Sequence, residues 1–149
     1  MISNCGHDEN RRYRNGTAGD QTGGEYCIRT WYNRPWNCVL RYPDEKVGSV
    51  IGSIASYAAN NALIGYDQNQ RTTFYQQLSS SGWHPENIRV ACEADCSAST
   101  AAVVIAAGHR LGIASLANVN PNLTTYNMRA ALKAVGFEVL TDSRYLSGE

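Results

Sequence analysis

The sequence predicts an α+β fold, and three observations lead to this class. Apolar residues recur at helical spacing in the segment 45–60, and a second helical segment rich in Ala and Val covers 96–107. Short runs rich in strand-forming residues lie at 25–32, 36–42 and 137–140. The length of 149 residues fits one domain with its own core. We therefore expect residues 1–149 to form a single α+β domain.

The N-terminal third of the chain predicts an ordered loop or a polar arm, followed by strands. Residues 1–24 are rich in Gly, Asn, Arg and Asp, and their glycines oppose a regular helix. The two strand-like runs at 25–32 and 36–42 flank a turn at 33–35, which predicts a hairpin or two nearby edge strands. The segment 19–23 could be an anion-binding loop or a tight turn held by Asp20, and the turn is favoured because the segment lacks the Lys of a phosphate loop.

The middle of the chain predicts two helices and a short strand. The first helix begins at Pro43-Asp44-Glu45, where a proline and acids suit the first turn, and it ends near residue 60. A second helix is expected over 68–78, and a short strand over 88–90. These elements predict core packing and carry no evident chemistry.

The last third predicts a central helix and a second small helical region. The helix that begins at Cys96 is expected to end near Ala107, with Gly108 as its C-cap. Residues 109–123 are expected to be irregular. A last helix should begin near Thr124 or Thr125 and be followed by a short strand at 137–140.

Cys96 is the strongest candidate for a chemical role. It follows Asp95, an expected N-cap, and lies in the first turn of a helix of small residues. Backbone N–H groups and the helix dipole favour a thiolate there and offer donors to an oxyanion. The alternatives are a buried small residue or half of a disulfide, for which Cys92 is the nearest partner.

Composition argues against several other classes. The formal net charge is zero, so the chain has no general attraction for nucleic acid or anionic lipid. It has no apolar run of membrane-spanning length and no signal peptide, which predicts synthesis in the cytoplasm. The five cysteines are expected to be reduced thiols. Their spacing gives only a weak case for zinc, and neither a metal nor a cofactor is expected.

The sequence resembles the catalytic domains of bacteriophage endolysins, the papain-like cell-wall cysteine peptidases and amidases related to the CHAP and NlpC-type groups. The resemblance covers nearly the whole chain in the same order. It is carried by the segments 18–23, 31–37, 64–68 and 92–97, and later by 130–132 and 137–143.

The resemblance implies a papain-like fold and peptidoglycan as the partner. It implies that Cys96 is the nucleophile, which attacks an amide of the stem peptide or cross-bridge and forms a thioester. Tyr66 resembles a tyrosine that flanks the site, and Asp67 and Trp36 are candidates for substrate binding beside it. For Trp36, core packing remains an equal alternative. The enzyme would act in phage lysis, made in the host cytoplasm and released to the wall of a Gram-positive cell.

The sequence departs from the family pattern at the general base. The family's histidine lies on a downstream strand, after a segment that this chain does not reach. We therefore expect an N-terminal portion of a catalytic domain, with an incomplete sheet and no activity alone, which would bind a complementary C-terminal fragment or form a homo-oligomer. His7 and His84 are weak substitutes, and His109 lies at the wrong end of the Cys96 helix.

Two other functions stay open from the sequence. The chain could be a non-catalytic wall-binding or interaction domain that keeps the fold without a base, or, as the lowest-ranked alternative, a small zinc-binding module. Amidase and endopeptidase chemistry use the same Cys–His machinery, so the residues do not specify which bond is cut.

Overall fold

The structure is a computed structural model, and it describes residues 1–147. The strands are β1 (Ile2–Cys5), β2 (Tyr26–Arg29), β3 (Val39–Arg41), β4 (Ile64–Tyr66), β5 (Cys92–Ala94) and β6 (Glu138–Leu140). The helices are α1 (Glu45–Ala59), α2 (Thr73–Ser80), α3 (Cys96–Leu111), α4 (Ala114–Ala117), α5 (Met128–Ala134) and α6 (Ser143–Leu146), with a 3₁₀ turn at Pro85–Asn87. The α+β class is confirmed.

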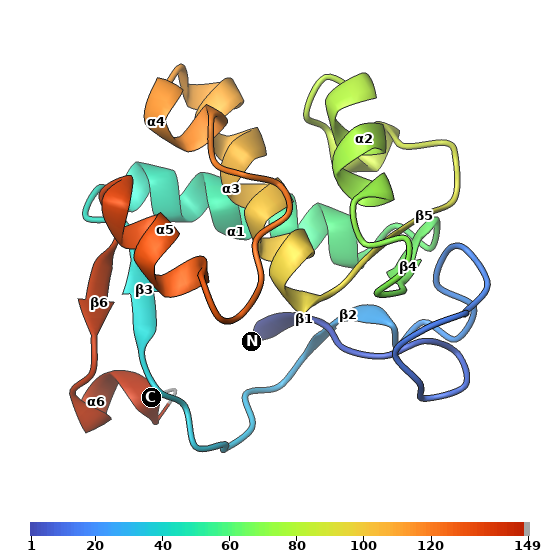
Figure 1. The fold of residues 1–149 in the computed structure, drawn as a ribbon, viewed down its shortest axis with the longest axis horizontal. Coiled ribbons are helices and arrows are strands. Elements are labelled where there is room, and N and C mark those ends of the chain that lie inside the picture. Colours follow the sequence, from blue (N-terminus) through green and yellow to red (C-terminus); the bar gives the residue numbers. More distant parts are fainter. Residues whose placement is uncertain (148–149) are drawn as a thin grey trace.

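Helix α3 is the centre of the molecule, and α1, α2 and α4 pack against it (Figure 1). Its small side chains permit close approach: a Cβ added to Gly108 would lie 2.3 Å from the backbone nitrogen of Ala117 in α4. One face of α3 contributes Val103 and Ala106 to a core shared with α1, α2 and β4. Another face contributes Val104 and Ile105 to a second core, shared with α4 and α5. Burial on both sides fixes the helix and therefore fixes its first residue.

The strands form three separate pairs among the described residues. β1 and β2 are antiparallel, with Cys5 opposite Tyr26, and β3 and β6 are antiparallel across about one hundred residues of sequence. β4 and β5 are parallel and fully buried, with Tyr66 opposite Ala94. The parallel pair leads directly into α3, so it sets where Cys96 begins the helix.

Two predictions for the N-terminal third need correction. Residues 6–24 form neither helix nor strand, as expected of a loop, but Ile2–Cys5 forms β1 against β2. The hairpin alternative is wrong, because β2 pairs with β1 and β3 pairs with β6, so that each is an edge strand of its own two-stranded sheet. Strand propensity is a local property, whereas the choice of partner depends on packing against α1 and α3. The Asp20 turn is confirmed: its Oδ1 accepts backbone N–H groups from Thr22, Gly23 and Gly24.

The remaining elements confirm some predictions and correct others: α2 begins at Thr73 and not near residue 68, and α5 begins at Met128 and not near Thr124. The helix over 45–60 is confirmed as α1, with Asp44 as its N-cap. No strand forms at 88–90, and the buried strand lies instead at Cys92–Ala94. Helix α3 continues past Gly108 to a left-handed cap at Gly112, and 114–117 is helical where irregular chain was expected. None of the helices in residues 1–147 is long and apolar enough to cross a membrane.

Candidate functional site

The site begins at the turn between β5 and α3, and Asp95 controls that turn. Its Oδ1 accepts the backbone N–H groups of Ser97 and Ala98 at 2.9 and 2.8 Å. These bonds satisfy two of the donors that a helix start leaves free. The predicted N-cap is therefore confirmed, and it leaves Cys96 in the first turn of α3.

Arg71 lies in the loop before α2, and its hydrogen bonds connect this turn with that loop and with residues 122–123. Its Nε lies 2.7 Å from Asp95 Oδ2 and its Nη2 lies 3.1 Å from Asp95 Oδ1, a bidentate pair. The same guanidinium donates to the Ser97 hydroxyl at 2.8 Å and to the backbone carbonyls of Asn122 and Leu123. Burial opposes ionisation of Asp95, but the Arg71 bonds and the backbone N–H groups hold its pKa below the ordinary carboxyl value.

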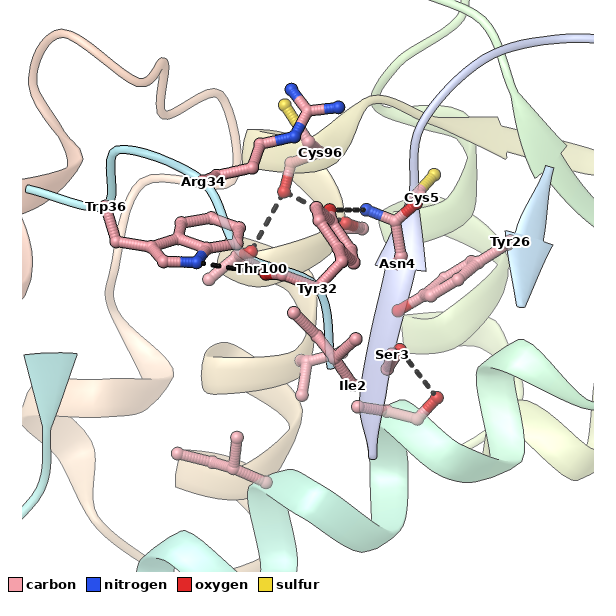
Figure 2. Close-up of a pocket in the computed structure, with 14 residues that line it drawn as sticks. Ile2, Ser3, Asn4, Cys5, Tyr26, Tyr32, Arg34, Trp36, Cys96 and Thr100 are labelled. Atoms are coloured by element: carbon pink, nitrogen blue, oxygen red, sulfur yellow. Dashed lines mark hydrogen bonds between the residues drawn. The ribbon is translucent and has the colours of Figure 1, made fainter. Parts of the chain in front are cut away.

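The Cys96 side chain is exposed at the junction of two pockets. The first pocket, of about 380 Å³, lies between α3, α1, β1 and the segment 30–38 (Figure 2). The second, of about 330 Å³, lies between the start of α3, the loop after β4 and the segment 118–127. A substrate chain passing over the sulfur would occupy both, so the reacting atom has room on each side.

The two pockets differ in chemistry. The first has an apolar floor and an aromatic wall, with Asn4 and Arg34 as its longer polar side chains. Its apolar and aromatic lining residues are Ile2, Tyr26, Tyr32, Trp36, Ile51, Ala55 and Val103. The second is polar, and it is lined by Arg14, Gln68, Arg71, Asp95, Ser97, Thr124 and Thr125 beside Cys96.

The expected thiolate is not favoured by the environment of Cys96. Burial raises the pKa of the thiol, and the Asp95 carboxylate raises it further, against smaller opposite effects from the backbone N–H groups of Ser97 and Cys96 and from Arg71. The prediction that the helix start would stabilise the thiolate was therefore wrong in its net sign. The N–H groups lower the thiol pKa as predicted, but burial of the sulfur, together with the Asp95 carboxylate as the second cause, raises it by more.

None of the three histidines hydrogen-bonds the Cys96 sulfur within residues 1–147. His7 Nδ1 lies 2.9 Å from the backbone oxygen of Asp8, and His84 Nδ1 lies 3.0 Å from Glu86 Oε1. His109 stacks on Trp83 with ring centroids 4.0 Å apart, at the far end of α3 as expected. No histidine is therefore placed to accept the thiol proton.

The three predicted substrate residues occupy different environments. Trp36 lines the first pocket with Cys96, and its indole nitrogen donates to the backbone oxygen of Tyr32 at 3.4 Å. Tyr66 is buried on β4 and lines neither pocket, but its hydroxyl accepts a hydrogen bond from Gln68, which lines the second. Both carboxylate oxygens of Asp67 accept backbone N–H groups, Oδ2 from Gly16 and Oδ1 from Asn69. Their roles in substrate binding stay predictions.

Sequence reasoning missed Arg71, Arg34 and Glu93. Arg71 and Arg34 lie in loops, where no periodic pattern marks a residue, and the partners of Arg71 are distant in sequence. The Cys92 thiol is buried on β5, and all five cysteines are free. No group of three His, Cys, Asp or Glu side chains in residues 1–147 is arranged to hold a metal ion.

The family model of the endolysin-like domain matches residues 2–149. No curated protein and no solved structure matches the chain. The family match spans β1, both pockets and Cys96, so the whole site lies within it. The chain belongs to the endolysin-like domain family.

Proposed function

We propose that the protein is a cysteine-dependent peptidoglycan hydrolase of the endolysin type, with a papain-like arrangement of nucleophile and helix. The observation that carries the proposal is the position of Cys96, exposed in the first turn of a buried helix at the junction of two pockets. Membership of the endolysin-like family supports the bacterial cell wall as the substrate.

The chemistry begins with attack of the Cys96 sulfur on a substrate carbonyl carbon. A carbon–sulfur bond forms, and negative charge develops on the carbonyl oxygen. The backbone N–H groups of Cys96 and Ser97 lower the pKa of the thiol and are therefore close enough to stabilise that charge, although the Ser97 N–H also donates to Asp95 Oδ1. Collapse of the intermediate breaks the carbon–nitrogen bond and leaves a thioester, which water then hydrolyses.

The leaving amine needs a proton, and the thiol must first lose one. A histidine ordinarily does both, and the three histidines of this chain lie elsewhere. We therefore infer that these 149 residues hydrolyse wall amides slowly or not at all until a base is supplied by a further segment. This inference concerns turnover and leaves the identity of the nucleophile unchanged.

The rival function is a wall-binding or interaction domain without catalysis. The raised pKa of the Cys96 thiol and the positions of the histidines favour it. The free sulfur between two pockets favours the hydrolase. The rivals differ in what happens to Cys96, because a binding domain does not need a nucleophile.

Release of dye from labelled Gram-positive walls tests the proposal. We expect release by a version of the chain that carries the family's histidine segment after residue 149, and little release by the 149 residues alone. Cys96→Ala should abolish the release, whereas Cys38→Ala, which alters a half-buried cysteine outside both pockets, should not. Wall binding without release by either version would contradict the proposal and support the rival. Mass spectrometry of the released fragments identifies the bond.

A further inference from the structure

We propose that Arg34 binds a substrate carboxylate beside Cys96, so that the first pocket accepts an anionic peptide with small aliphatic side chains. This inference rests on the proposed function, because that function makes the ligand a substrate. Binding of a carboxylate by Arg34 can nevertheless be tested without hydrolysis. Arg34 and Cys96 line the same pocket, and Figure 2 draws the guanidinium on the Cys96 side of it.

The segment 30–38 holds Arg34 in place through aromatic contacts. The guanidinium carbon lies 5.3 Å from the centroid of the Tyr32 ring, within cation–π distance. The Tyr32 hydroxyl accepts a hydrogen bond from Asn4 Nδ2 at 3.4 Å, and the Tyr32 and Trp36 rings are 5.6 Å apart. The cation is therefore supported on one side by an aromatic ring that is itself fixed to β1.

Arg34 has no carboxylate partner within residues 1–147. The ion pairs there are Arg71 with Asp95, His84 with Glu86 and Arg144 with Asp142. A guanidinium offers five N–H donors in a planar fork that matches a carboxylate. In the second pocket, Arg71 already uses its fork on Asp95. Arg34 is consequently the cation in the first pocket that is available to a ligand.

The floor of the pocket limits what can accompany that carboxylate. Ile2, Ile51, Ala55 and Val103 present apolar surface below Tyr32 and Trp36. Such a floor favours short aliphatic groups and disfavours a second charge, because burial of an unpaired charge is costly. The stem peptides of peptidoglycan combine free carboxylates with alanine methyl groups, which is the chemistry that the pocket would recognise.

The polar pocket supplies a matched control for this assignment. Arg14 also faces Cys96, but from the opposite side, and its Nε donates to Gln68 Oε1 at 3.3 Å. Arg14→Gln and Arg34→Gln remove the same charge on the two sides of one sulfur. If only general electrostatics attract an anionic ligand, both substitutions should weaken the attraction. If the first pocket holds a carboxylate site, only Arg34→Gln should weaken it.

Alkylation of the 149-residue chain tests the proposal. Iodoacetate and iodoacetamide have nearly the same size, and each transfers its carbon to the thiolate: a carbon–sulfur bond forms, the carbon–iodine bond breaks, and iodide leaves. The measured quantity is the ratio of the two rate constants at Cys96, followed by peptide mass spectrometry. The same ratio in the urea-unfolded chain gives the intrinsic value.

We expect the ratio of the iodoacetate to the iodoacetamide rate constant to be about fourfold higher in the folded chain than in the unfolded chain. One unit charge at about 5 Å in a water-like medium gives an effect of this size. Arg34→Gln should remove this preference, Arg34→Lys should largely retain it, and Arg14→Gln should change it less than twofold. An unchanged ratio in Arg34→Gln, or equal losses in Arg34→Gln and Arg14→Gln, would overturn the proposal. If Arg34→Gln does not fold, the rate ratios of folded Arg34→Lys and Arg14→Gln test the proposal instead. Loss of the iodoacetate preference in Arg34→Lys would then contradict the proposal. Because alkylation needs no base, failed wall hydrolysis together with a retained Arg34 effect would reject the proposed function alone.

Discussion

Glu93 and Asp95 are two residues apart and both are buried, yet their surroundings have opposite effects. Asp95 accepts two backbone N–H groups and a bidentate guanidinium, and these contacts keep its pKa low. Glu93 Oε1 accepts one N–H, from Gly19 at 2.7 Å, and its Oε2 has no hydrogen-bond partner within residues 1–147. Burial raises the pKa of Glu93 to about 8. Because both carboxylates are buried, their hydrogen-bond and ion-pair partners determine which of the two has the lower pKa.

The side of β5 that holds Glu93 is crowded with other acids. Glu25, Asp67 and Glu9 each raise the pKa of Glu93 further. Glu25 is itself buried, and burial raises its pKa as well. The backbone oxygen of Gly19 and Glu93 Oε2 both lie close to Gly65. The raised pKa favours the neutral form of Glu93 at pH 7, whereas the lowered pKa of Asp95 favours the carboxylate beside Cys96.

Loss of the Asp95 carboxylate, whose oxygens are hydrogen-bonded, should have the largest effect on stability. Asp95→Ala removes the α3 cap and leaves Arg71 without its partner, so we expect a loss of about 3 kcal/mol in the free energy of unfolding. Asp44→Ala removes a comparable cap from α1, where Asp44 is exposed and has no guanidinium, and should cost about 1 kcal/mol. Urea unfolding measures both. Equal losses would show that Arg71 adds nothing to the turn.

Gly65→Ala should disturb the packing around Glu93 and lower the free energy of unfolding by about 2 kcal/mol. A Cβ at Gly65 would lie 2.3 Å from the Gly19 oxygen and 2.9 Å from Glu93 Oε2, so the 6–24 loop must move away from β4. Gly52→Ala is the control, because nothing lies within 4 Å of the added atom and alanine is the better helix residue. Thermal unfolding should show opposite shifts. A neutral Gly65→Ala would contradict the close packing.

Glu93 should make stability depend on pH. Between the ordinary carboxyl value and pH 8 the folded chain keeps a proton that the unfolded chain has lost, so rising pH favours unfolding. From pH 6 to pH 7 the expected loss is about 1 kcal/mol, and Glu93→Gln should remove it. Glu86→Gln should not, because the pKa of exposed Glu86 is lowered and it titrates below this interval. Parallel pH profiles for wild type and Glu93→Gln would refute the raised pKa.

The smallest effect concerns the charge in front of the sulfur. Asp95→Asn keeps a capping oxygen but removes the anion that raises the pKa of Cys96. Alkylation of Cys96 by iodoacetamide at pH 7 should therefore become about threefold faster. The pH profile of the rate constant should move to lower pH. An unmoved profile would mean that burial alone raises the pKa.

The sequence predicted what depends on local chemistry. The helix start at 43–45, the N-cap at Asp95, the turn at Asp20 and the small-residue helix all follow from neighbours within a few residues, and all were confirmed. The pairing of β1 with β2 and of β3 with β6 was missed, because it depends on packing across the chain. For the same reason the pairing of Arg71 with Asp95 and the raised pKa of Glu93 were missed, since each needs residues that meet only in three dimensions.

Acylation by a p-nitrophenyl ester of an N-acetylated alanine tests whether Cys96 is a nucleophile. Nitrophenolate leaves without a proton, so the step needs no general acid and the 149 residues can be used alone. We predict a burst close to one nitrophenolate per chain at about pH 9, with the acyl group on the Cys96 peptide, absent in Cys96→Ala and retained in Cys38→Ala. A burst that survives Cys96→Ala, or acyl groups shared equally with Cys27 and Cys38, would contradict the account.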